Sequence, residues 1–446
     1  MNPKNCIILA TLTASLGLAA TSIPALAANH NLKPDNTPDS LTQWLSKSKI
    51  TGQFRDYYYT EKYEKILPFK HTNSIGGWLN IHTPGFHGWS VDLGAYTAQS
   101  LGLNAHNAKT QVGDLPYYNL TVLGQAYIQY RNYGFKIRAG NQPVDTPFAQ
   151  SNTMDLRMIP PLFQGIGGSY KTPVKGLSVY AYRMFRFKDW ASSSFQTTDT
   201  GKGGYNVIAP VPRVSSGGFV TLGAKEHYGK STAQFWYYDF YNRLSLGYGE
   251  YAYKLPLHGS ALKALLFGAQ YAREWNTGNQ AAPYKNVDST LVGLRVGFLV
   301  PHDILFLSYN NVQNHPGAFR GGGFISPYLL GEYDTSTIYT DVFGVALGSV
   351  VGSPGHAYGI KDVLKFPKHH LTFIGKYTQL YAPDEFIGTN GPIKGVGTAH
   401  SWDFIARYNF AKSWAFKFLY AAIHNNSHLG TIQIGRVYLT YNFSEE

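Results

Sequence analysis

Cysteine is almost absent from this chain. The one cysteine in 446 residues, Cys6, lies in a segment with the pattern of a secretory signal peptide. Lys4 supplies a positive charge, residues 7–18 form a short apolar stretch, and Ala25-Leu26-Ala27 is a typical cleavage site. We therefore expect residues 1–27 to be a cleavable signal peptide. The mature chain then has no disulfide and no thiolate for catalysis or metal binding.

Charged residues are also scarce, at 14% of the chain against about 25% in a typical globular domain. After the signal segment there is no run of about 18 apolar residues, so we expect no membrane-spanning helix. Aromatic residues are abundant in contrast, with 34 Tyr and 26 Phe beside 47 Gly. This combination is typical of transmembrane β-barrels, which need an apolar, aromatic outer surface and small residues for curvature.

The charges that are present are mainly positive, with a formal net charge of +12. The lysines and arginines are spread singly along the chain, and no basic block occurs. This distribution favours a lined channel for small anionic solutes over a nucleic-acid surface, and we expect no nucleic-acid partner.

The pattern of segments predicts the architecture. Residues 28–50 form a polar periplasmic lead-in, and from Gly52 onwards short aromatic and β-branched segments alternate with turn signals. Tight turns alternate with longer connections near 100–117, 143–160, 188–216, 274–287, 314–353 and 382–399. Short periplasmic turns and long extracellular loops are typical of outer-membrane barrels. Counting residues 338–348 as part of a loop gives about 18 strands. We therefore expect residues 51–443 to form an all-β transmembrane antiparallel β-barrel of about 18 strands.

The last segment, Thr431 to Phe443, shows the alternation most clearly. Val437, Leu439, Tyr441 and Phe443 share one apolar face, and the residues between them are polar apart from Tyr438. We expect the apolar face to contact outer-membrane lipid, and the barrel-assembly machinery to recognise this strand. The chain continues after Phe443 with Ser-Glu-Glu instead of ending in an aromatic residue.

The cost of burying charge predicts which strand residues face the lumen. An Arg or Lys that faces lipid in mid-bilayer costs roughly 2–4 kcal/mol, whereas the same residue in a water-filled lumen costs little. Basic residues between apolar alternates should therefore point inwards. As a set they predict a basic lining that binds solutes, although each could also be merely solvated. They are Arg131, Lys136, Arg138, Arg183, Arg295, Lys361, Lys365, Lys376, Arg407, Lys417 and Arg436.

Two long loops are candidates for a constriction. Residues 143–160 carry Asp145, Asp155 and Arg157, followed by apolar residues that a solvated loop would not need. Residues 314–353 carry Glu332 and Asp334 beside aromatic residues. Acidic groups on inserted loops, opposite a basic wall, would set up a transverse field. The alternative is that both are ordinary surface loops.

Motifs for other chemistry are weak. Residues 223–231 nearly match a phosphate-binding loop, but their glycines are one residue too far apart. The histidines lack metal-ligand spacing. We expect no cofactor, no metal and no enzymatic activity. Two alternatives stay open, namely a barrel-embedded outer-membrane lipid enzyme and a receptor or adhesin that uses its loops.

The segment Asp155–Gly165 (DLRMIPPLFQG) resembles a motif of OprD-type outer-membrane channels. In those channels the motif is followed by a strand that begins Gly-Leu and ends in an Arg, and the matching strand here reads GLSVYAYRMFRF. Residues 52–59, residues 270–278 and the closing strand are also similar. The resemblance implies an 18-stranded barrel in the outer membrane of a Gram-negative cell, present as a monomer or loose homotrimer. It implies passive diffusion of amino acids, peptides or organic acids along a ladder of basic residues.

Overall fold

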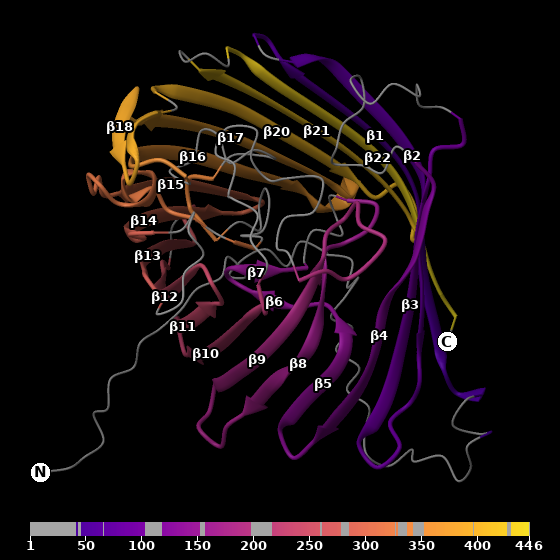
Figure 1. The fold of residues 1–446 in the computed structure, drawn as a ribbon. Coiled ribbons are helices and arrows are strands. Elements are labelled where there is room, and N and C mark those ends of the chain that lie inside the picture. The colour runs from indigo at the N-terminus through magenta and orange to yellow at the C-terminus, as the bar shows by residue number, and fades with distance from the viewer. Residues whose placement is uncertain are drawn as a thin grey trace, which may run out of the picture.

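The fold was analysed in a computed structural model. It describes residues 42, 46–65, 67–102, 118–151, 157–197, 216–258, 261–277, 285–325, 327–328, 337–341, 352–395, 397–425 and 430–445. These residues form one antiparallel sheet of 18 strands, which curves into a barrel (Figure 1). No helix in the described residues is long and apolar enough to cross a membrane.

The wall is built from strands that follow one another in chain order. They are β1 (Lys49–Tyr63), β2 (Leu67–His82), β3 (Trp89–Gln99), β4 (Leu120–Asn132), β5 (Phe135–Gln142), β8 (Leu162–Lys171), β9 (Leu177–Lys188), β10 (Phe219–Tyr228), β11 (Ser231–Phe240), β12 (Leu244–Pro256), β13 (Ala264–Trp275), β14 (Asp288–Val300), β15 (Asp303–Val312), β16 (Gly355–Phe366), β17 (Leu371–Tyr381), β20 (Ala399–Tyr408), β21 (Trp414–Asn425) and β22 (Ile432–Glu445).

Pairing between the first and last strands closes the barrel. β1 and β22 run antiparallel in continuous register from Ile50↔Glu445 to Tyr63↔Ile432. β15 pairs directly with β16, so no wall strand lies between them; of the residues 338–348 assigned to a loop, 342–348 lie outside the described residues. The predicted all-β barrel of 18 strands is therefore confirmed. Two small hairpins lie outside the wall, β6 (Asp145–Thr146) with β7 (Ala149–Gln150), and β18 (Glu385–Gly388) with β19 (Gly391–Lys394).

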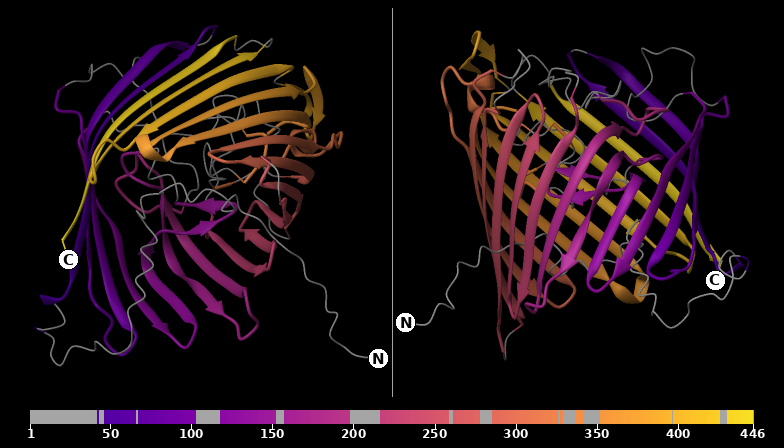
Figure 2. Two further views of the ribbon diagram at one scale, coloured as in Figure 1. Left: turned by 180° about the vertical axis from the view of Figure 1, so that it is seen from behind. Right: turned by 60° about the horizontal axis from the view of Figure 1, so that its bottom comes forward.

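The connections divide the barrel into a turn end and a loop end. At the turn end, which also holds the start of β1 and the end of β22, connections such as 133–134 and 301–302 are short. The loop end carries the long connections, including 143–161 and 313–354, although 64–66 and 241–243 are short. Figure 2 shows the two ends from other directions.

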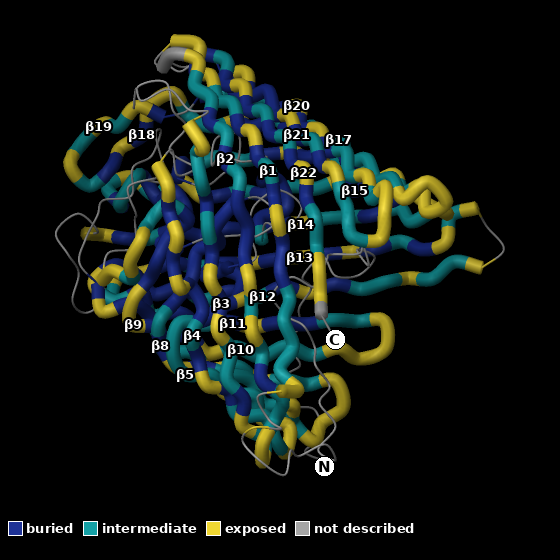
Figure 3. Tube along the Cα trace, turned by 90° about the vertical axis from the view of Figure 1, so that its right-hand side faces the viewer, coloured by how far each residue is buried: buried dark blue, intermediate teal, exposed yellow. Residues whose placement is uncertain are grey.

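Alternation along the strands separates an outer face from an inner face. Residues paired across neighbouring strands share a face, so the exposed residues Ile166, Leu222, Leu294 and Ile360 mark the outside. The same alternation of buried and exposed positions runs along the tube in Figure 3. The outer face is apolar over most of its area, which water would not stabilise.

Aromatic rings border this apolar outer face. At the turn end Phe135 stacks on Tyr170 with ring centroids 4.3 Å apart, and Trp89 lies 5.0 Å from Tyr130. At the loop end Tyr309 and Tyr358 are 5.1 Å apart. Two aromatic borders with aliphatic residues between them are typical of a barrel that lies in a bilayer.

The closed wall requires glycine where β1 and β2 approach most closely. Gly77 has a φ of +143°, and a Cβ there would lie 1.8 Å from the carbonyl oxygen of Gln53. We expect Gly77→Ala to destabilise the barrel by about 1–3 kcal/mol, because the strain has no local relief. Chemical unfolding in detergent would measure this loss. Gly375→Ala is the matched control, since its Cβ meets nothing within 4 Å. Equal stability of both variants would contradict the prediction.

Candidate functional site

The connection between β5 and β8, residues 143–161, folds into the barrel in its two described parts, 143–151 and 157–161. We call it the strap. Its β6–β7 hairpin lies inside the wall (Figure 1). Phe148, at the hairpin tip, is fully buried against Tyr238 of β11 and Tyr248 of β12, with ring centroids 5.8 and 5.1 Å apart. The Phe148 N–H also donates to the Tyr238 hydroxyl over 3.3 Å.

The far end of the strap is attached to the opposite side of the barrel. Arg55 of β1 donates to the carbonyl oxygen of Arg157 over 3.0 Å, and the Arg157 guanidinium lies 4.6 Å from the Trp190 ring centroid. Met158 and Ile159 are buried in the same apolar cluster as Tyr57. Because β12 is the ninth strand along from β1 in an 18-stranded wall, the strap joins directly opposed walls.

The described parts of the connection between β15 and β16, residues 313–354, also pack on the inner wall. The N–H of Ile325 donates to the Glu274 carboxylate of β13 over 3.0 Å. The Tyr339 hydroxyl donates to Glu250 of β12 over 2.7 Å. Burial raises the pKa of Tyr339 well above its ordinary value, so this hydroxyl keeps its proton and remains a donor.

These two loops touch each other inside the barrel. The Thr337 hydroxyl donates to the carbonyl oxygen of Pro147 over 2.6 Å, and the Phe148 and Phe324 ring centroids are 5.6 Å apart. Both loops therefore crowd the wall formed by β11 to β13. The 313–354 connection also extends further round the wall, because the Thr340 N–H donates to Asn310 of β15 over 3.0 Å and Asp341 lies within range of Lys376 of β17. The wall from β16 through β22 to β1 faces the tip of the strap.

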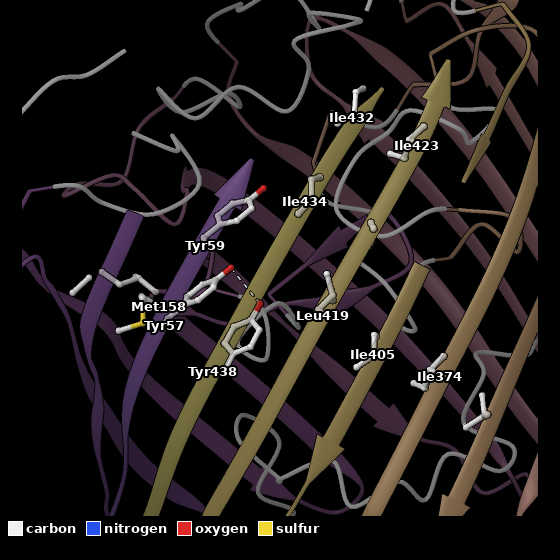
Figure 4. Close-up of a cluster of buried hydrophobic side chains, with 14 of the residues drawn as sticks. Tyr57, Tyr59, Met158, Ile374, Ile405, Leu419, Ile423, Ile432, Ile434 and Tyr438 are labelled. Atoms are coloured by element: carbon white, nitrogen blue, oxygen red, sulfur yellow. Dashed lines mark hydrogen bonds between the residues drawn. The ribbon is translucent and has the colours of Figure 1, made fainter. Parts of the chain in front are cut away.

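That facing wall carries basic side chains on either side of an apolar row. Val363, Ile374, Ile405 and Leu419 are cross-strand neighbours and fully buried; three of them are labelled in Figure 4. A charged row lies on each side of this apolar row, two residues along the strands in either direction. At about 3.3 Å per residue, each charged row is roughly 7 Å from the apolar row. The row nearer the loop end has Lys361, Lys376 and Asp403, and the row nearer the turn end has Lys365, Arg407 and Lys417.

The inward-facing basic residues differ in how far they reach the lumen. Arg295, Lys361, Lys365 and Arg407 are partly exposed, whereas Lys376 and Lys417 are 6% exposed. The Arg295 guanidinium lies 4.2 Å from the Tyr339 ring centroid, so this wall residue also contacts a constricting loop. The partly exposed residues are those a solute could touch.

Arg436 is 0% exposed and lies within a group of tyrosines. Its guanidinium is 4.4 Å from the Tyr59 ring centroid and donates to the Tyr59 hydroxyl over 3.3 Å. Beside it Tyr438 donates to Tyr57 over 3.2 Å (Figure 4). Arg436 is thus covered by protein and acts on the lumen only through its charge. Arg55 also belongs to this group, although the sequence analysis did not identify it as an inward charge. The alternation along β1 could have shown this, because Phe54 and Tyr58 face outwards and Arg55 lies on the opposite face.

A separate basic group lies on β4 and β5 near the turn end. Arg131 and Lys136 are cross-strand partners, and Arg138 stacks 4.7 Å over the Tyr127 ring and donates to Gln129 over 2.9 Å. The three predicted residues of these strands therefore face inwards together, at a different place from the β14–β22 residues.

The inward orientation predicted for Arg183 is wrong. That prediction would place the alternate residues Tyr180, Tyr182 and Met184 outside, but Met184 is buried in the interior and Tyr180 packs 5.3 Å from Trp236. Arg183 pairs with the outward positions Ile166 and Val220, and it therefore faces outwards. The reason is that aromatic residues cover both faces of this part of the wall, so they do not distinguish lipid from interior.

Acidic groups are present on the two inserted loops. Asp145 is exposed on the β6 strand of the strap, within electrostatic range of the inward Tyr180 and Tyr182. Asp341 lies within range of Lys376. Asp155, Glu332 and Asp334 lie outside the described residues. No group of His, Cys, Asp or Glu suited to a metal ion occurs in the part of the chain that the structure describes.

Known proteins share this fold at low sequence identity. No protein-family model matches the chain, and no curated protein matches it either. Among solved structures, Pseudomonas aeruginosa OccK9 (OpdG) has a TM-score of 0.71 at 15% identity, over 90% of this chain and 100% of that one. Acinetobacter baumannii OccAB2 has 0.72 at 15% identity, over 90% and 99%.

A third similar structure is Pseudomonas aeruginosa OpdK, determined with vanillate, with a TM-score of 0.69 at 15% identity, over 90% of this chain and 100% of that one. The resemblance to OprD-type channels is therefore confirmed at the level of the fold.

We expect Phe148→Ala to release the tip of the strap, because it removes a buried ring from contact with three aromatic partners. Large-to-small changes at such sites cost about 3–5 kcal/mol. Hydrogen exchange of the residue 144–151 amides should therefore accelerate by about a hundredfold or more. Phe86→Ala, at an exposed turn-end ring, is the control and should leave these amides unchanged. Unchanged exchange in both would show that other contacts hold the strap.

Proposed function

We propose that this protein is an outer-membrane porin for the passive, selective diffusion of small carboxylate-bearing solutes. The solutes are amino acids, peptides or organic acids, and they pass along the basic inner wall. The observation that carries the proposal is the arrangement of the lumen, in which two inserted loops pack against the wall around β11–β13 and inward-facing basic side chains line the wall from β14 to β21.

The outer surface supports a membrane location. A closed sheet leaves no unpaired edge, so its backbone groups are satisfied without water. The exposed apolar residues between the two aromatic borders suit a hydrocarbon layer. We place the barrel in the outer membrane of a Gram-negative cell, with the turn end periplasmic. Export through the signal peptide, assembly through the last strand, and a monomeric or loosely trimeric state are parts of this proposal.

The inner surface supports selection of anions. Arg295, Lys361, Lys365 and Arg407 are partly exposed along the inner wall between β14 and β20, and Arg131, Lys136 and Arg138 lie nearer the turn end. A carboxylate that moves from one group to the next is never far from a cation, which lowers the cost of leaving bulk water. Asp145, on the strap, favours solutes that also carry a positive group. The similar structure of OpdK was determined with vanillate, which is itself a carboxylate.

A barrel-embedded lipid enzyme and a loop-based receptor or adhesin are the alternatives. An enzyme of this kind would hydrolyse lipid at an outward-facing nucleophile. A receptor would bind its partner through the loops and conduct nothing. Neither alternative requires the barrel to conduct ions, so a conductance measurement distinguishes both of them from a channel.

Single-channel recording in planar bilayers tests the proposal. We expect openings with a reversal potential that favours anions under a KCl gradient, and transient block by added small carboxylates. Arg295→Gln combined with Lys361→Gln should weaken the block about tenfold or more, since a hydrogen bond to a charged group contributes about 1.5–3 kcal/mol. Arg273→Gln removes an outward-facing charge that pairs with Asp288, and it should leave the block unchanged.

The outcomes are distinct. Strong cation preference would exclude the basic-wall mechanism and leave a channel. Silence from correctly folded protein would exclude the channel itself and favour the receptor or the enzyme.

A further inference from the structure

A β-bulge in β9 places two arginines on the outer face of the barrel. The register between β8 and β9 shifts so that Gln164 opposes Arg186 while Gly165 opposes Met184, which leaves Phe185 without a partner. In a regular strand, residues three apart face opposite sides. The bulge instead puts Arg183 and Arg186 on the same side, with exposed Phe185 between them.

The first of these arginines is held in a fixed orientation. One terminal nitrogen of Arg183 donates to the carbonyl oxygens of Met184 and Gly217, over 2.6 and 2.7 Å. Its guanidinium carbon lies 4.6 Å from the ring centroids of both Phe185 and Tyr241. Stacked guanidinium groups lose little further freedom when they bind a planar or tetrahedral anion.

The position of these residues marks the edge of the apolar belt. Exposed Ile166 on β8 is the cross-strand partner of Arg183, and Val179 on β9 and Leu222 on β10 are exposed and apolar and lie nearer the turn end. Beyond them towards the loop end come Arg183 and Arg186, with the amides of Gln164 and Asn141, which bond over 3.0 Å. Aliphatic side chains are thus followed by aromatic and cationic side chains towards the loop end. In a lipid leaflet the acyl chains are followed in the same way by the headgroups.

The charge of this patch is positive. Asp239 is the acidic neighbour on the same outer face, two strands from Arg183 and within its electrostatic range. It offsets one of the two guanidinium charges. Elsewhere on the outer face Arg273 pairs directly with Asp288, so that arginine is neutralised within the protein.

We propose that Arg183, Phe185 and Arg186 form a binding site for a phosphate-bearing lipid headgroup at the loop end of the outer wall. The phosphate accepts hydrogen bonds from the guanidinium groups, and the acyl chains lie along Ile166, Val179 and Leu222. The inference depends on the membrane location given under the proposed function, but not on solute selectivity.

Native mass spectrometry of the full barrel tests this site, with bisphosphorylated lipid A as the probe and its dephosphorylated form for comparison. We expect wild-type protein to retain the bisphosphorylated lipid preferentially. Arg183→Gln combined with Arg186→Gln should weaken retention about tenfold or more, and Arg186→Gln alone should weaken it less. Arg273→Gln is the control of equal charge and should retain lipid as the wild type does.

Three results would overturn the proposal: equal retention of both lipids, wild-type retention by the double variant, or displacement of the lipid by inorganic phosphate at equal concentration. The heat-modifiable mobility of each variant establishes that it is folded, and the single variant covers the case in which the double variant does not fold. Conductance of the same samples should match the wild type. A barrel that retains lipid but does not conduct would therefore contradict the channel and not this site.

Discussion

The register between β1 and β22 is the constraint on which the rest of the structure depends. Fourteen consecutive residue pairs join the two ends of the chain, and without them the sheet would have two unpaired edges. Closure also sets which face of every strand points inwards, because cross-strand partners share a face all the way round. One error of register at this seam would turn apolar residues towards the lumen and basic residues towards lipid.

Closure leaves a wide interior, and the loops then determine its shape. The strap and the 313–354 connection bind the β11–β13 wall through Tyr238, Glu250 and Glu274. Both loops use buried polar partners there. The wall from β16 to β22 carries its charges in rows on either side of an apolar row. The asymmetry of the lumen thus arises from where the loops attach and not from the barrel itself.

The sequence was a good guide to the barrel and a partial guide to the site. Arg295 lies between Val292, Leu294 and Val296, and aliphatic neighbours of this kind indicate the phase of a strand without ambiguity. Around Arg183 the neighbours are Tyr and Met, which serve on either face, and a bulge follows two residues later, so the phase inferred there was wrong. The burial of Arg436 depends on tyrosines of β1, which are almost 380 residues away in the chain. No local pattern contains that information.

Attachment of the strap to opposed walls has a mechanical consequence. A cylinder of strands tied only to their neighbours flattens easily under lateral pressure, whereas a tie across its diameter resists ovalisation. The bonds from Arg55 to residue 157 and from Phe148 to Tyr238 form such a tie. Any motion that widened the interior by detaching the strap would also soften the cross-section, so the width of the interior and the rigidity of this barrel change together.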